Sequence, residues 1–117
     1  MFFKKWLNWR KNVAGDCYQA NAKELMYDSK FKNAILIHGI ALLSADKKPF
    51  GHCWIEKGNT VYDFSNGKKI KINKSVYYNM GGIPVKGFKN YKYKLDEVRV
   101  KILKTGHWGP WDSKPPR

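Results

Sequence analysis

The sequence predicts a single α+β domain over residues 1–117, and three observations carry this prediction. Residues 16–26 are rich in helix-favouring residues and follow a helix-start pattern. Residues 51–64 read as a β-hairpin, because two runs rich in aromatic and β-branched residues flank a turn. Alternating apolar and polar residues at 68–72 and 91–94 predict further strands.

The composition is that of a globular chain with a strong positive charge. Hydrophobic residues make up 43% and charged residues 27% of the chain, a balance typical of folded domains. The formal net charge of +14 favours an anionic partner, such as nucleic acid, a membrane surface or an acidic protein. The lysines of the second half are scattered rather than clustered, which favours solvated faces over a dedicated nucleic-acid site.

Cysteine usage and hydropathy limit the cellular environments in which we expect the protein. The spacing of the two cysteines, Cys17 and Cys53, gives neither a disulfide framework nor a set of metal ligands. We therefore expect no cofactor and no metal, and a reducing, cytoplasmic environment with free thiols. No apolar run reaches the roughly 20 residues of a membrane span, and the basic N-terminus lacks the continuous apolar core of a signal peptide.

The N-terminal segment, residues 1–12, predicts a short amphipathic helix. One interpretation is an interfacial helix that contacts an anionic membrane through residues 2–9. The other is that its aromatic side chains cover the core of the domain. The second is favoured, because the segment is short for surface binding on its own.

A second helix is expected to begin at Gly15-Asp16-Cys17, with Asp16 as N-cap. Cys17 then lies in the first turn, where backbone N–H groups and the helix dipole stabilise a thiolate. The most apolar run, 33–43, predicts a central strand in which Gly39 marks a bulge or a close backbone approach. His38, within that run, is expected to be a packing histidine.

The C-terminal third combines weaker signals. Residues 76–80 suggest a helical turn, and residues 95–104 fit both a strand and a helical face. Helix is favoured there, because Asp96 and Glu97 stand in its first turn and Gly106 follows as a stop. The aromatic tail beyond it is expected to pack against the domain.

The hairpin fixes the relative placement of four side chains. Gly58-Asn59 suits a two-residue loop, because such loops need positive φ. That loop pairs Trp54 with Asp63, and alternation along the strands puts His52, Trp54, Val61 and Asp63 on one face. A carboxylate beside an imidazole fixes its tautomer and supports its charged form.

Cys17, His52 and Asp63 supply, in chain order, the three groups of a thiol-dependent acyl transfer site. A thiol nucleophile needs a base to take its proton, and a carboxylate behind the imidazole orients that base. Cys53 is adjacent to His52, but neighbours in a strand point to opposite faces. Cys53 is therefore expected to be a buried small hydrophobe rather than the nucleophile.

These motifs resemble the catalytic core of the transglutaminase-like branch of the papain-like superfamily. The likeness covers about residues 14–65 and is carried by the cysteine-first order, by Gly-His-Cys-Trp-Ile-Glu and by Val-Tyr-Asp. Members commonly show His-Ala-Trp-Val-Glu, a turn, and a strand that ends in Asp; here Cys53 replaces the alanine and Phe64 follows where proline is common. The resemblance implies a cysteine-bearing helix packed on an antiparallel sheet, with Cys17 as nucleophile, His52 as general base and acid, and Asp63 as the orienting residue.

The function indicated is a cysteine-dependent amide hydrolase or acyl transferase acting on a protein or peptide, of the peptidase, amidase, deamidase or transglutaminase type. Trp54 is expected to pack near His52, where it either forms a wall of the site or fills the core. A backbone N–H of Cys17 or Tyr18 is the first candidate for the oxyanion donor, and the side chain of Gln19 is the second. The alternative is a catalytically inactive basic protein that recognises an acidic protein or nucleic acid.

Overall fold

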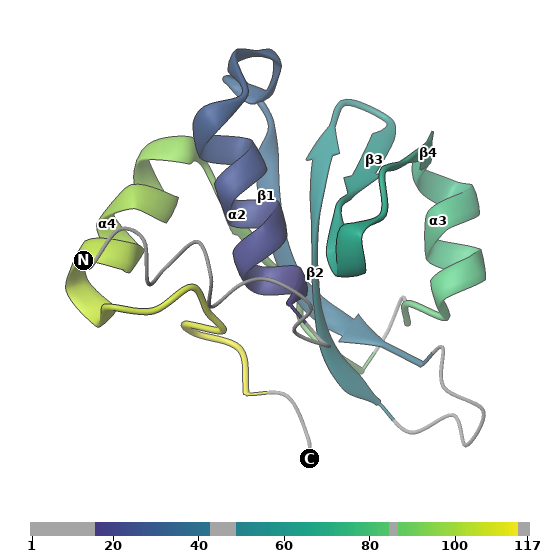
Figure 1. Cartoon of the computed structure of the whole chain (residues 1–117). Helices are drawn as coiled ribbons and strands as arrows, with labels where there is room; N and C mark the ends of the chain where they lie inside the picture. The colour runs from purple at the N-terminus through teal and green to yellow at the C-terminus, as the bar shows by residue number, and fades with distance from the viewer. Residues whose placement is uncertain (1–15, 43–48, 85–86, 115–117) are drawn as a thin grey trace.

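The computed structural model describes residues 16–42, 49–84 and 87–114; the helix expected over 1–12 lies outside them. Within the described residues, three α-helices surround a five-stranded antiparallel sheet with strand order β4-β3-β2-β1-β5 (Figure 1). The α+β class is therefore confirmed. The strands are β1 (Ile35–Ala41), β2 (Phe50–Lys57), β3 (Thr60–Asp63), β4 (Ile70–Asn73) and β5 (Tyr91–Tyr93). The helices are α2 (Cys17–Tyr27), α3 (Lys74–Gly81) and α4 (Leu95–Thr105), with 3-10 turns η1 (Ser29–Phe31) and η2 (Ser65–Gly67).

The β2–β3 hairpin has the loop that its sequence predicts. Gly58 has a φ of +58°, the left-handed conformation that a tight hairpin loop requires. Lys57 pairs with Thr60 and Glu56 pairs with Val61, so two residues connect the strands. The pairing of β2 with β3 ends at Ile55 and Tyr62, so Trp54 and Asp63, expected as a pair, lie just beyond the paired residues. Beyond Ile55, toward His52, β2 continues alongside β1.

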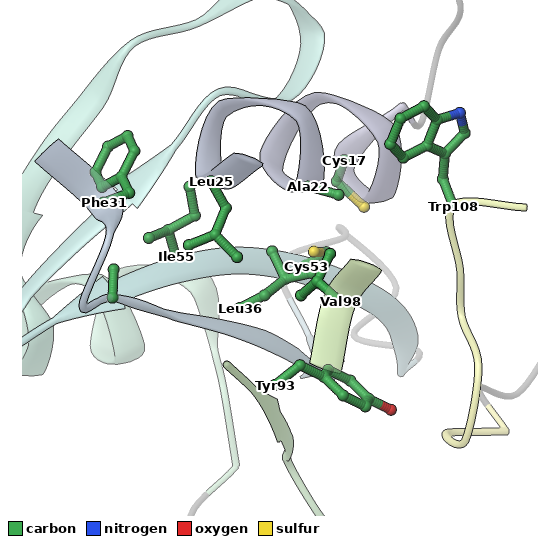
Figure 2. Close-up of a cluster of buried hydrophobic side chains, with 11 residues drawn as sticks. Cys17, Ala22, Leu25, Phe31, Leu36, Cys53, Ile55, Tyr93, Val98 and Trp108 are labelled. Carbon is green, nitrogen blue, oxygen red and sulfur yellow. The ribbon is translucent and has the colours of Figure 1, made fainter. Parts of the chain in front are cut away.

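The sheet has a hydrophobic core on each face. One core lies beneath α2 and α4 (Figure 2), and it includes Leu25, Cys53 and Val98. The other lies beneath α3 and contains Trp54 and Tyr77. Adjacent residues Cys53 and Trp54 therefore point into different cores, as the alternation of a strand requires.

Strand β1 occupies the centre of the sheet, as the apolar run predicts. Six of its seven residues are buried, and it pairs with β2 on one side and β5 on the other. Gly39 marks a close approach: a Cβ at this position would lie 2.5 Å from Asn90 Oδ1 and 2.6 Å from Trp54 Cη2. Any larger residue would therefore push these side chains away.

The C-terminal helix begins and ends as expected. Asp96 and Glu97 lie in the first turn of α4, where carboxylates interact favourably with the helix dipole. Gly106 ends the helix in a left-handed conformation, with φ 74°. Trp108 in the following tail is buried against the core beneath α2. Among the helices of the described ranges, none has the length and apolar character needed to cross a membrane.

Candidate active site

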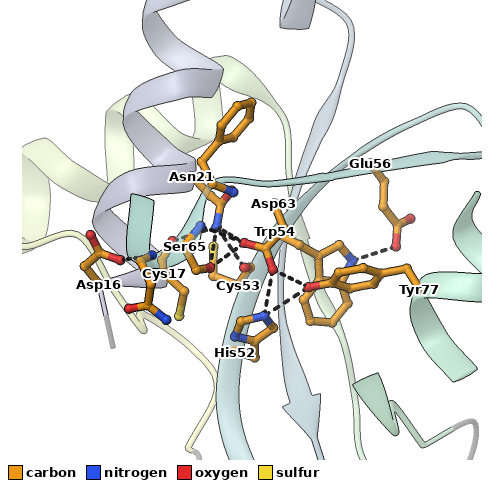
Figure 3. A network of polar contacts seen from close by, with 12 residues as sticks. Asp16, Cys17, Asn21, His52, Cys53, Trp54, Glu56, Asp63, Ser65 and Tyr77 are labelled. Atoms are coloured by element: carbon orange, nitrogen blue, oxygen red, sulfur yellow. Dashed lines mark hydrogen bonds and ion pairs between the residues drawn. The ribbon is translucent and has the colours of Figure 1, made fainter. Parts of the chain in front are cut away.

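The hairpin brings His52 and Asp63 into contact, as the loop length predicts. His52 Nε2 lies 3.1 Å from Asp63 Oδ2 (Figure 3). The His52 side chain is 20% exposed and that of Asp63 is 6% exposed, so the imidazole reaches solvent while the carboxylate stays behind it. This is the arrangement in which a carboxylate orients an imidazole.

Helix α2 supplies the thiol. Cys17 is its first residue and lines the same cleft as His52 and Asp63. In Figure 3 the sulfur lies beside the His52 ring. His52 also makes a side-chain hydrogen bond with Cys17. Asp63 and Tyr77 both engage Nε2, which leaves Nδ1 as the ring nitrogen for the thiol.

The start of α2 is held in place by a contact that the sequence did not suggest. Asp16 is the N-cap residue, but its side chain makes no capping hydrogen bond, so the expected capping role is wrong. Instead, Asp16 Oδ1 accepts a hydrogen bond from the backbone N–H of Asn66, at 2.8 Å. Asn66 itself adopts a left-handed conformation, with φ 56°. This contact fixes the first turn of α2 beside the chain that follows Asp63.

Asn21, one turn after Cys17, connects the three elements that carry the site. Its Nδ2 donates to the carbonyl oxygens of Cys17 and Cys53, each at 2.9 Å, and to Asp63 Oδ1 at 3.2 Å. Its Oδ1 accepts from the backbone N–H of Phe64 at 2.9 Å. Asn21 has no measurable exposure, so these bonds are made away from water.

Asp63 is aimed by bonds to both of its oxygens. Oδ1 accepts from the backbone N–H of Ser65 at 2.9 Å and from the Ser65 hydroxyl. Oδ2 accepts from Tyr77 OH at 2.7 Å as well as facing His52. The chain thus orients the carboxylate with Ser65 and Asn21.

Helix α3 carries Tyr77, whose side chain reaches the site. The helix is anchored to β2 through Glu56, whose carboxylate accepts from Tyr78 OH and pairs with Lys74 Nζ at 3.2 Å. Trp54 Nε1 also donates to Glu56, at 2.9 Å. The buried charge of Glu56 is therefore satisfied, and the contacts hold α3 where Tyr77 reaches Asp63.

The electrostatics of the site favour a charged imidazole. Burial lowers the pKa of His52, but hydrogen bonds with Asp63 and Cys17, and the charges on both, raise it to about 9. Burial raises the pKa of Asp63, yet its bonds to His52, Ser65 and Tyr77 hold that pKa well below the usual value. At neutral pH the pair is therefore imidazolium and carboxylate.

Cys53 has the environment of an inert thiol. It is fully buried beneath α2, in the same core cluster as Cys17 (Figure 2). Burial, followed by the nearby charges of Cys17 and Asp63, raises the pKa of the Cys53 thiol well above its ordinary value. A buried thiol of raised pKa reacts slowly, so the geometry agrees with a packing role for Cys53.

The remaining expected site residues have different surroundings. Tyr18 lines the cleft, and its buried hydroxyl has no hydrogen-bond partner among the described residues. Gln19 is buried and is not among the residues that line the cleft. Trp54 is fully buried behind His52, with ring centroids 5.8 Å apart, and fills the core.

His38 lies outside the polar network. It is fully buried among the rings of Tyr18, Tyr93 and Trp111, at centroid distances of 4.8 to 4.9 Å. Neither ring nitrogen has a hydrogen-bond partner among the described residues. Burial lowers its pKa to about 4, opposed by the charge of Asp112. His38 is thus a neutral packing histidine.

Within the described residues, no group of three or more His, Cys, Asp or Glu side chains is arranged to hold a metal ion. Comparison of the chain with protein-family models, with curated proteins and with solved structures finds no match. The case for function therefore depends on the chemistry of the site itself.

Proposed function

We propose that the chain is a cysteine-dependent amide hydrolase or acyl transferase, built on a papain-like, transglutaminase-like core. The observation that carries the proposal is the position of His52. Asp63 holds one of its ring nitrogens, and contacts with both Asp63 and Cys17 raise the pKa of the ring. This is the relation between nucleophile, base and orienting group that thiol catalysis needs.

In the first half of the reaction, the Cys17 thiolate attacks the carbonyl carbon of an amide. The carbon–sulfur bond forms as the carbonyl electrons move to oxygen. When the tetrahedral intermediate collapses, the carbon–nitrogen bond breaks and the leaving amine takes the proton from His52. A thioester on Cys17 and a neutral imidazole remain.

In the second half, neutral His52 removes a proton from water as the water oxygen attacks the thioester. Collapse of that intermediate releases the carboxylic acid and returns the sulfur of Cys17 as thiolate beside the imidazolium. An amine in place of water gives acyl transfer by the same steps. Asp63 holds the ring through both halves and stabilises its charged form.

The first turn of α2 is the proposed source of oxyanion stabilisation. The first N–H groups of a helix have no partner within the helix. Asp16 is the residue positioned to cap them, but its carboxylate accepts a hydrogen bond from the backbone N–H of Asn66 instead. The side chain of Asp16 therefore does not cap the N–H groups of Cys17 and Tyr18. These groups lie beside the sulfur, where the carbonyl oxygen of the substrate becomes the oxyanion.

Selective alkylation tests the proposal. Brief treatment with iodoacetamide at neutral pH, followed by peptide mass spectrometry, should modify Cys17 and leave Cys53 unmodified. Cys17 lines the cleft, whereas Cys53 is fully buried with a raised pKa. The variant His52→Gln should slow the labelling of Cys17 by about tenfold or more. Faster labelling of Cys53, or equal labelling of Cys17 in both proteins, would contradict the proposal and favour the basic binding protein instead.

A further inference from the structure

The cleft that contains Cys17 extends well beyond the thiol. It has a volume of about 430 Å³, which lies within the usual range for small-molecule sites. Past His52 its walls come from β4, from the end of α3 and from the residues after it. The aliphatic lining side chains on this side are Ile70, Ile72, Met80 and Ile83.

These side chains form an apolar wall that the proposed chemistry does not use. Ile83 is 5% exposed and packs in the core beneath α3, so its place is fixed. Met80 is 66% exposed and lines the cleft, so its side chain is accessible to a group that enters there. Methionine is flexible and polarizable, and it adapts to the shape of an apolar group that packs against it.

The charge of the lining is uneven. Lys68 lines the cleft, whereas its neighbour Lys69 does not. The acidic residue in the lining is Asp63, and both of its oxygens are already hydrogen-bonded. An anionic group that enters the cleft would therefore meet Lys68 without facing an unpaired carboxylate.

We propose that this cleft selects amide or ester substrates that carry an aliphatic group and a carboxylate beside the scissile bond. The aliphatic group packs against Ile70, Ile72, Met80 and Ile83, and the carboxylate pairs with Lys68. The inference rests on the proposed function, because it assumes that Cys17 is the reacting group. It adds a substrate class, which the three reacting groups alone do not specify.

Four alkylating probes separate the two features. N-chloroacetyl-leucine has both, its amide N-chloroacetyl-leucinamide has only the aliphatic group, N-chloroacetylglycine has only the carboxylate, and N-chloroacetylglycinamide has neither. In each case a carbon–sulfur bond to Cys17 forms as chloride leaves. Second-order labelling rates of Cys17, each divided by the rate with glutathione, measure recognition by the cleft.

We expect the leucine side chain to raise the labelling rate by about tenfold, from burial of its apolar surface. The carboxylate should add about three- to fivefold at low ionic strength, and this gain should shrink as salt is added. Met80→Ser should remove most of the leucine advantage, and Lys68→Ala should remove the carboxylate advantage. Val76→Ser, an exposed position on α3 outside the lining, and Lys69→Ala are the matched controls and should change neither.

The outcomes distinguish this inference from the proposed function. Fast labelling by iodoacetamide but equal rates with all four probes would overturn the substrate class and leave the nucleophile in place. A probe preference that survives Met80→Ser and Lys68→Ala would overturn the assignment to this cleft. Failure of Cys17 to react even with iodoacetamide would overturn the proposed function, and this inference with it.

Discussion

Replacement of Asp63 by Asn removes the charge behind His52 while keeping the shape of the side chain. The amide oxygen can still accept from Ser65 and Asn21, so the local chain should keep its path. What is lost is the hydrogen bond and the charge that raise the pKa of His52 against its burial. The variant should therefore fold but hold a much weaker base.

The size of the effect follows from the pKa of His52. With a pKa of about 9, about 99% of the His52 imidazole is charged at pH 7. With the ordinary histidine pKa of 6.5, only about a quarter would be charged at that pH. The difference is worth about 3 kcal/mol in favour of the imidazolium. Because burial opposes the charge and only the contributions of Cys17 remain to support it, we expect the Asp63→Asn variant to lower the pKa of His52 from about 9 toward 6.5.

A histidine NMR titration measures this directly. The protein has three histidines, His38, His52 and His107, and the variant His52→Gln assigns the resonance. Asp28→Asn, which removes an exposed carboxylate near Lys30, is the matched control and should leave His52 unchanged. A His52 pKa that stays near 9 in Asp63→Asn would refute the role given to Asp63.

Two further variants test the supports of the site, and a third prediction concerns the buried His38. Tyr77→Phe removes one donor to Asp63, so urea unfolding should show a loss of about 1.5–3 kcal/mol while the pKa of His52 stays raised; an unchanged stability would mean that the bond contributes nothing. Asn21→Ala should cost at least about 3 kcal/mol by the same measurement, since several buried groups lose their hydrogen-bond partner; a loss below about 1 kcal/mol would contradict the role of Asn21 in holding α2, β2 and β3 together. The neutral burial of His38 predicts that the contribution of this residue to the free energy of unfolding is complete above pH 6.5 and is lost as pH falls toward about 4. Over that range the unfolded chain binds a proton at His38 that the folded chain does not bind. The loss should reach about 3 kcal/mol, disappear in His38→Phe and persist in His107→Gln; a pH dependence that survives in His38→Phe would exclude His38 as its source.

The parts of the fold that the sequence predicted are those governed by local rules. Gly58-Asn59 determined the hairpin loop, and the loop determined which residues of β2 and β3 share a face. Cys17 at a helix start followed from the residues around it, and Gly106 marked the end of α4. Each of these predictions needed only neighbours along the chain or across one tight turn.

The supports of the site escaped prediction because they join distant segments. Asn21 contacts Cys53, 32 residues away, and Asp16 contacts Asn66, 50 residues away. Asn21 did carry a faint signal, since it stands four residues after Cys17 and so lies on the same side of the helix. Tyr77 carried none, because its reach to Asp63 depends on how α3 packs on the sheet.

Asp16 shows how tertiary contacts override a local preference. An aspartate before a helix favours capping of the first N–H groups. Here the turn after Asp63 presents the N–H of Asn66 to the same carboxylate, and that contact is made instead. The exchange links the start of α2 to the end of β3, the two segments that carry Cys17 and Asp63.

The most direct measurement of the central claim is the trapping of an acyl group on the sulfur. After brief exposure of the protein to p-nitrophenyl acetate at neutral pH, peptide mass spectrometry should locate an acetyl group on Cys17. The group should be hydrolysed over time, and it should form far more slowly in His52→Gln. Acetylation of Cys53 in preference to Cys17, or of lysines alone, would contradict the assignment of Cys17 as the nucleophile.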